Sequence, residues 1–239
     1  MRSRIRREES VIDIGNVLIS GGASGLGAAT ATAVAKAGGT PLVLDMAVPD
    51  AEHAYRLVDI ADSSAVAEAT AELAGSVGGR LDGVFTAAGI DCCGRLDEVA
   101  AADWERVVAV DLMGTAAVVR AALPHLASPS GRIVTCASTL GLKAVSDATA
   151  YCAAKFGVVG FTRALAAETA GRYGVTLLVP GGMDTSFFDG RTAQYRPPPD
   201  AHLNRPEDVA ATVVYALGQP EGCEIREMVV CASEESSWP

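Results

Sequence analysis

Short apolar runs alternate with longer Ala-rich runs along the chain from Asn16 onward. Several short runs are apolar throughout, without polar alternation, which is typical of strands in a parallel sheet that is covered on both faces. The predicted strands are Asn16–Ser20, Pro41–Asp45, Arg56–Asp59, Gly83–Ala87, Arg132–Ala137, Val175–Val179 and Glu224–Cys231. The predicted helices are Leu26–Ala37, Ser64–Val77, Trp104–Leu126, Ala150–Tyr173 and Pro206–Leu217. This alternation predicts an α/β fold with a doubly wound parallel sheet of about seven strands and helices on both faces.

No linker divides the 239 residues, so we expect a single domain over residues 1–239. We expect residues 1–14 to be flexible. The basic cluster there precedes Glu8 and Glu9 rather than the apolar run of a signal peptide. The cluster consists of Arg2, Arg4, Arg6 and Arg7.

Composition removes several classes of function. The formal charge of −10 argues against a nucleic-acid partner, because no basic stripe could follow phosphates. No apolar stretch is free of charges and helix breakers over the length of a membrane span, so we expect a cytoplasmic protein. The six cysteines include no C-x-x-C pair and the three histidines are scattered, so we expect no metal site and reduced thiols.

A glycine-rich turn follows the first predicted strand. Residues 20–27 read Ser-Gly-Gly-Ala-Ser-Gly-Leu-Gly and lead into an Ala-rich helix. Glycines permit a tight turn and let the backbone approach a pyrophosphate, which then lies over the positive end of the helix. Glycine-rich turns are common, but this position in an alternating chain favours a dinucleotide site. The loop residues expected to hold the cofactor are Gly21, Ser24, Gly25, Leu26 and Gly27.

The second predicted strand ends in an acidic residue that bears on the choice of cofactor. Asp45 lies eighteen residues beyond Gly27. A carboxylate there accepts hydrogen bonds from the ribose hydroxyls of the adenosine and repels a 2′-phosphate. Met46 and Ala47 follow, and the glycine loop carries no Arg or Lys. We therefore expect NAD (NADH) rather than NADP.

Three polar residues form a candidate catalytic set. Tyr151 and Lys155 lie one helical turn apart on one face of a predicted helix, and Ser138 follows a predicted strand thirteen positions before Tyr151. Tyr151 would exchange a proton with the substrate oxygen. Because a phenol of pKa ~10 is a poor base near neutrality, Lys155 would lower that pKa. Ser138 would hold the oxygen on which charge develops.

Taken with the loop and Asp45, this set resembles the short-chain dehydrogenase/reductase family, in its compact single-domain Rossmann-like branch. The matching motifs run in the family's order from the first strand to the last, and they also include Thr86-Ala-Ala-Gly89 and Pro180-Gly181. The resemblance implies that Asp59 fixes the adenine amino group, that Thr185 contacts the nicotinamide carboxamide, and that Lys155 also binds the nicotinamide ribose. Further cofactor contacts are expected from Ile60, Ala88, Gly89, Tyr151, Pro180, Gly181 and Met183.

Asp111 stands where the family usually carries Asn, a residue thought to hold a water that relays protons to the lysine. We include Asp111 in the catalytic set. An ionised Asp accepts from water but cannot donate, and it adds negative charge near Lys155. Altered pH dependence is therefore expected.

The sequence predicts the substrate class and the assembly only in general terms. Residues 183–205 should form a lid over a small ketone or alcohol, and two long helices should pair between copies into a homodimer or homotetramer. The Ala-rich, Arg-over-Lys composition is similar to that of GC-rich bacteria, in which ketoreductases often finish secondary metabolites. The alternative is a non-catalytic NAD-binding sensor that kept the fold.

Overall fold

The computed structural model describes residues 14–50 and 52–238, so the basic N-terminal cluster lies outside it, as does nearly all of the segment expected to be flexible. The strands are β1 (Asn16–Ser20), β2 (Thr40–Asp45), β3 (Ala54–Leu57), β4 (Gly83–Thr86), β5 (Arg132–Cys136), β6 (Gly174–Pro180) and β7 (Glu227–Val230). The α-helices are α1 (Gly25–Lys36), α2 (Ser63–Ser76), α3 (Ala101–Val108), α4 (Thr115–Ala122), α5 (Thr149–Glu168) and α6 (Pro206–Leu217).

The strands form one seven-stranded sheet in the order β3-β2-β1-β4-β5-β6-β7, and each neighbouring pair is parallel. The chain starts in the middle of the sheet, winds to one edge, returns to β4 beside β1 and winds to the other edge. This order confirms the predicted doubly wound fold. In such a sheet, ligands bind outside the carboxyl ends of the strands where the winding reverses, here between β1 and β4.

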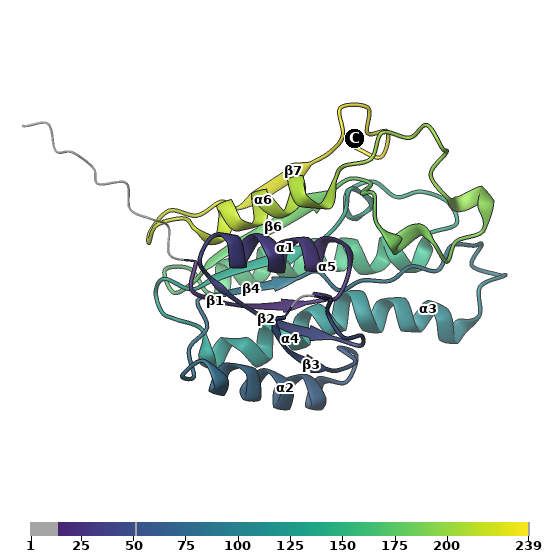
Figure 1. Ribbon diagram of the computed structural model, residues 1–239. Coiled ribbons are helices and arrows are strands. Elements are labelled where there is room, and N and C mark those ends of the chain that lie inside the picture. The colour runs from purple at the N-terminus through teal and green to yellow at the C-terminus, as the bar shows by residue number, and fades with distance from the viewer. Residues whose placement is uncertain (1–13, 51, 239) are drawn as a thin grey trace, which may run out of the picture.

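Helices cover both faces of the sheet (Figure 1). On one face, α1 and α6 pack over a core that includes Val34, Phe85 and Val213. On the other face, α2 and α4 pack over a second core that includes Leu73 and Val118, and α5 contributes to it. The central strand β1 is buried along nearly its whole length, which explains why its sequence shows no polar alternation.

Most boundaries differ from the predictions by one to three residues, and two of the differences have a local cause. β3 ends at Leu57 rather than Asp59, because an Asp59 oxygen accepts a hydrogen bond from the Ala61 N–H at 3.0 Å and turns the chain. α5 ends at Glu168 rather than Tyr173. Gly171 beyond it has φ +75°, which is outside the helical region and which glycine adopts without strain.

The predicted helix over residues 104–126 is a continuous helix, Ala101–His125, with a six-residue π-helical segment at Ala109–Gly114 between α3 and α4. This segment contains Asp111, whose side chain is fully buried. π-Helical segments inside α-helices are frequent at functional sites. Contrary to expectation, this helix is long and apolar enough to cross a membrane, the one such helix among the described residues. It packs against α2 and α5 in the body of the domain.

Candidate active site

A cavity of about 950 Å³ opens at the carboxyl edge of the sheet, where β1, β2, β4, β5 and β6 end. Every residue that we expected to bind the cofactor lines it. Ser138, Tyr151 and Lys155 line it as well. Asp111 is absent from the lining among the residues that the structure describes, because it lies behind Lys155.

The glycine loop is shaped for a close ligand. Gly21 has φ +72°, and a Cβ atom added there would lie 2.6 Å from the Ala88 nitrogen, so only glycine fits. Helix α1 begins at Gly25, and no capping hydrogen bond from the Ser24 side chain is found in the described chain. The first N–H groups of α1 therefore remain available for a phosphate. The loop fits a dinucleotide.

Asp45 lies at the end of β2, beside this loop. One oxygen accepts from the Ala23 N–H and the other from the Ala47 N–H, each at 2.9 Å. No Arg or Lys is close to Asp45 along the sequence, but helix α3 places the cation of Arg106 close to the end of β2. The Nη2 atom of Arg106 lies 3.8 Å from the Met46 sulfur.

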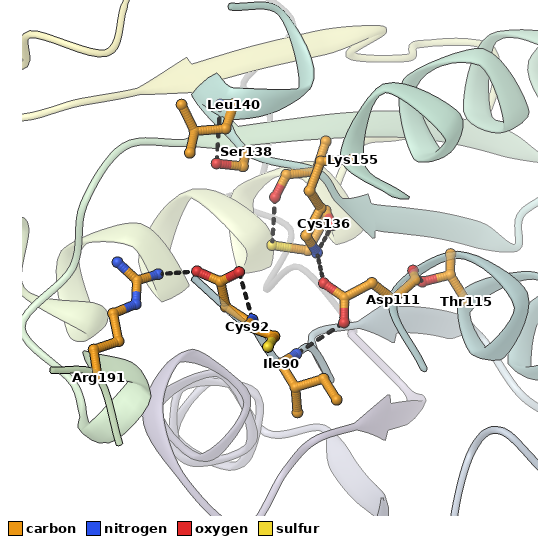
Figure 2. Close-up of polar contacts among 11 residues, drawn as sticks. Ile90, Cys92, Asp111, Thr115, Cys136, Ser138, Leu140, Lys155 and Arg191 are labelled. Carbon is orange, nitrogen blue, oxygen red and sulfur yellow. Dashed lines mark hydrogen bonds and ion pairs between the residues drawn. The ribbon is translucent and has the colours of Figure 1, made fainter. Parts of the chain in front are cut away.

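The catalytic set comes together at the ends of β5 and α5. The Lys155 Nζ donates to the Cys136 carbonyl at 3.2 Å and lies 5.4 Å from the centre of the Tyr151 ring. Ser138 follows β5 in an extended conformation, and its Oγ accepts from the Leu140 N–H at 3.1 Å. All three side chains are buried. Figure 2 shows the Lys155 side chain reaching toward Cys136 and Asp111, and the Ser138 hydroxyl beside Leu140.

The pKa of Tyr151 differs from the sequence expectation. The pKa is raised to about 12, mainly by burial and also by the Asp111 charge, while the Lys155 ammonium and the Ser138 side chain lower it by less than burial raises it. Lys155 thus acts in the expected direction but does not bring the phenol below its ordinary pKa of ~10. Near neutral pH the phenol of the ligand-free protein carries its proton.

Asp111 pairs directly with Lys155. Its Oδ2 lies 3.3 Å from the Lys155 Nζ, and its Oδ1 accepts from the Ile90 N–H at 2.8 Å (Figure 2). Burial is the largest single influence on the pKa of Lys155 and lowers it, but the charges of Asp111, Tyr151 and Cys136 together with the hydrogen bond to Asp111 outweigh burial, so the pKa rises. The carboxylate therefore holds both the lysine and the backbone after Gly89, next to the cofactor cavity.

The segment 183–205 lies over the cavity and is tied to the β4–α3 loop. Arg191 pairs with Asp91 at 2.6 Å, and both side chains are largely buried. The guanidinium lies over the rings of Phe187 and Phe188, 5.1 and 4.6 Å from their centres. The Phe187 ring in turn contacts that of Tyr151, with 5.8 Å between centres. The ion pair thus places an aromatic wall against the candidate catalytic tyrosine.

The C-terminal segment also reaches the cavity, which sequence analysis did not anticipate. One Glu235 oxygen accepts from the Gly182 N–H at 2.8 Å, and the Ser237 hydroxyl lies 2.6 Å from that of Thr139. Residues 234–237 line the opening. No sequence motif predicts these contacts of Glu235 and Ser237, because they depend on the position of the chain after β7 in the folded protein.

Some residues near the cavity lie outside its lining. Cys92 and Cys93 are on the loop after Asp91, but neither appears among the described lining residues. Cys93 donates to Asp91 at 3.1 Å, and burial raises the pKa of its thiol to about 12. The described residues contain no group of three or more His, Cys, Asp or Glu side chains that could hold a metal ion.

Comparison with known proteins gives a consistent family. Residues 15–196 match the short chain dehydrogenase family model. The chain is 35% identical over 217 residues to a cis-4-hydroxycyclohexanecarboxylate dehydrogenase of Sinomonas cyclohexanicum, covering 83% of this chain and 87% of the relative. It is 33% identical to levodione reductase of Leifsonia aquatica, covering 76% and 74% of the two chains.

A solved structure agrees with these sequence matches. A short chain dehydrogenase from Burkholderia cenocepacia in complex with NADP superposes with a TM-score of 0.80 at 26% identity, covering 92% of this chain and 97% of that chain. The chain therefore belongs to the short-chain dehydrogenase/reductase family and is an oxidoreductase acting on an alcohol or carbonyl group.

Proposed function

We propose that this protein is an NADH-dependent ketoreductase that reduces a ketone of a small, partly apolar substrate to a secondary alcohol. The observation that carries the proposal is that the buried side chains of Tyr151, Lys155 and Ser138 line the same cavity as the glycine loop. When bound, NADH supplies the hydride that adds to the carbonyl carbon.

The chain's own residues handle the proton. The carbonyl oxygen gains negative charge as the hydride arrives, and Tyr151 gives it the phenolic proton to complete the alcohol. The Ser138 hydroxyl stabilises the oxygen by hydrogen bonding during that step. Lys155 stabilises the phenolate that remains, since its ammonium lies over the tyrosine ring. A pKa near 12 keeps Tyr151 protonated at neutral pH, which suits reduction better than oxidation.

The cofactor preference rests on Asp45. Its carboxylate is fixed by two backbone N–H groups at the end of β2, where the ribose of the adenosine would lie. It accepts from ribose hydroxyls and repels a 2′-phosphate. Arg106 lies beside Met46, yet its guanidinium is neutralised by Asp59 and does not reverse this preference.

The substrate would enter beneath the 183–205 lid. Phe187 offers an apolar surface next to Tyr151, while the Arg191–Asp91 pair is internally neutral, so the wall favours a ring or short apolar chain over a strongly charged group. The named substrate of the Sinomonas relative is a cyclohexane ring that bears a hydroxyl group and a carboxylate. Its ring agrees with the cyclic class proposed here, whereas its carboxylate is a charged group that this wall does not favour. Reduction of a cyclic intermediate of bacterial secondary metabolism agrees with the apolar surface of Phe187 and with the ring in the relative's substrate.

The test is NADH consumption with a panel of cyclic and linear ketones, followed at 340 nm. We expect turnover with at least one cyclic ketone and a clear preference for NADH over NADPH. Binding of NADH without turnover on any ketone or secondary alcohol would instead support the alternative, a non-catalytic sensor. The Asp111–Lys155 ion pair favours that alternative, because it holds the lysine directly where the family usually carries Asn.

A further inference from the structure

Arg106 has no role in the family's catalytic pattern, yet it lies on the cofactor cavity. It projects from α3 one helical turn before Val110, which also lines the cavity. Its side chain is about one-third exposed, so it forms part of the rim rather than the core.

Arg106 is held by a two-point contact with Asp59. Its Nη1 lies 2.8 Å from Asp59 Oδ2, and its Nη2 donates to Asp59 Oδ1 at 2.9 Å. The same Oδ1 accepts from the Ala61 N–H. Hydrogen bonding to Arg106 holds the pKa of Asp59 below its usual range. Paired contacts between a guanidinium and a carboxylate fix the plane of the guanidinium as well as its position.

The contacts of Asp59 use most of the capacity of its carboxylate to accept hydrogen bonds. The resemblance implies that Asp59 accepts directly from the adenine amino group, but Oδ1 already accepts from Arg106 and from the Ala61 N–H, and Oδ2 accepts from Arg106. Of the about four lone pairs of a carboxylate, one on Oδ2 remains for the amino group. Around this pair, the cavity wall is apolar and consists of Met46, Val58, Ile60 and Val110. An apolar wall with a planar cation at its rim suits the face of an aromatic base.

We propose that Arg106 covers the adenine base of the bound dinucleotide, and that Asp59 is a positioning residue that holds the guanidinium in place. This inference rests on the proposed function only in requiring a dinucleotide cofactor. Because the contact is made to the face of the base, it tolerates changes at the amino group. It also acts on the adenosine half of the cofactor alone, far from the nicotinamide.

The experiment is equilibrium binding, followed by the fluorescence of the reduced nicotinamide, with no substrate present. Arg106→Ala should weaken NADH binding about 3- to 30-fold, the range of a cation–π contact that is partly to fully desolvated. Reduced nicotinamide mononucleotide, which lacks adenosine, should bind the variant and the unmodified protein equally. The matched control is Arg56→Ala, because Arg56 forms a similar surface pair with Glu72 outside the cavity lining. It should leave both affinities unchanged.

Two further arms separate the roles of Arg106 and Asp59. Asp59→Asn should weaken NADH binding less than Arg106→Ala does, and the double variant should match Arg106→Ala because both changes act on one contact. Reduced nicotinamide hypoxanthine dinucleotide, which lacks the adenine amino group, should bind the unmodified protein within about threefold of NADH, since stacking tolerates either base.

Each contrary result overturns the inference. NADH affinity unchanged in Arg106→Ala excludes the contact, and an equal loss for the mononucleotide shows a general structural effect. Additive losses, or poor binding of the hypoxanthine analogue, assign the base to Asp59 directly. A loss confined to NADPH assigns Arg106 to a 2′-phosphate. If the unmodified protein binds no dinucleotide, the proposed function fails together with the inference, whereas the other outcomes leave that function standing.

Discussion

The carboxylate of Asp111 lies 3.3 Å from the ammonium of Lys155, and neither side chain is appreciably exposed. A buried pair of this kind replaces the neutral Asn that the family usually carries. The Asp111 charge raises the pKa of Lys155 and, through space, the pKa of Tyr151, which Lys155 itself lowers. Three titratable groups are therefore coupled at the point where the proton is transferred, which makes the pH dependence of the reaction the most direct readout of this site.

Asp111→Asn should shift the pH–rate profile for alcohol oxidation toward lower pH. Oxidation needs the phenolate of Tyr151, so its rate rises with pH throughout the range below the phenol pKa, which is about 12 in the ligand-free protein. Removing the Asp111 charge lowers that pKa, because the charge raises it in the present chain. The rise should therefore come at lower pH. The measurement is kcat/KM for oxidation from pH 6 to 10. Asp103→Asn, at an exposed position on α3, is the control. An unshifted profile would remove the electrostatic role of Asp111.

Tyr151→Phe should abolish turnover while NADH binding stays nearly intact, because only the phenolic proton is lost. Loss of a positioned general acid costs about 10²–10⁴ in rate.

Lys155→Ala should reduce both turnover and NADH affinity, since the ammonium is proposed to contact the ribose as well as the phenol. Turnover numbers and binding titrations on both variants check this. Wild-type activity in Tyr151→Phe would make the assigned mechanism wrong.

Asp45→Ala combined with Met46→Arg should narrow or reverse the preference for NADH. The first change removes a carboxylate that repels a 2′-phosphate, and the second supplies a cation where β2 ends. Calorimetric titration with NADH and NADPH measures both affinities. The reverse outcome, equal or better NADPH binding by the unmodified protein, would contradict the NAD assignment before any variant is made.

Arg191→Met should raise KM for the substrate by about tenfold or more, because a broken buried pair leaves the Asp91 charge without its partner and releases the lid. Hydrogen exchange should show weaker protection of residues 183–205. Adding Asp91→Asn removes the unpaired charge and should recover part of the loss. Arg205→Met, in an exposed pair with Glu207, is the control and should change neither quantity. Unchanged lid protection in Arg191→Met would show that the pair does not fasten the lid.

Phe156→Asp should convert the proposed homotetramer or homodimer into a monomer of about 24 kDa. Phe156 is 45% exposed on α5, and the same exposed face carries Ala153, Gly160 and Ala164, whose small side chains would let a second helix approach closely. A charge placed there would be buried without a partner. Light scattering measures the mass, with Tyr215→Asp on α6 as the exposed control. A monomer before any substitution would exclude this interface.

Local pattern alone was sufficient for the order of strands and helices and for most of the cavity. The run of apolar residues at 17–19, in a chain of alternating short and long runs, favours a strand buried on both faces, and parallel strands place their carboxyl ends at one edge. The motifs that end a strand or begin the next helix, such as the glycine loop and Ser138, are therefore expected at that edge. The one-turn spacing of Tyr151 and Lys155 fixed their shared face.

Only the tertiary structure decided which side chains from distant parts of the sequence contact each other. Arg106 reaches Asp59, Arg191 reaches Asp91, and Glu235 reaches Gly182 across 47, 100 and 53 positions of sequence, so no periodicity links these partners. Burial, likewise, is a property of the packed whole. Sequence indicated correctly that Lys155 lowers the pKa of Tyr151, but only the packing around the phenol shows that desolvation outweighs this attraction.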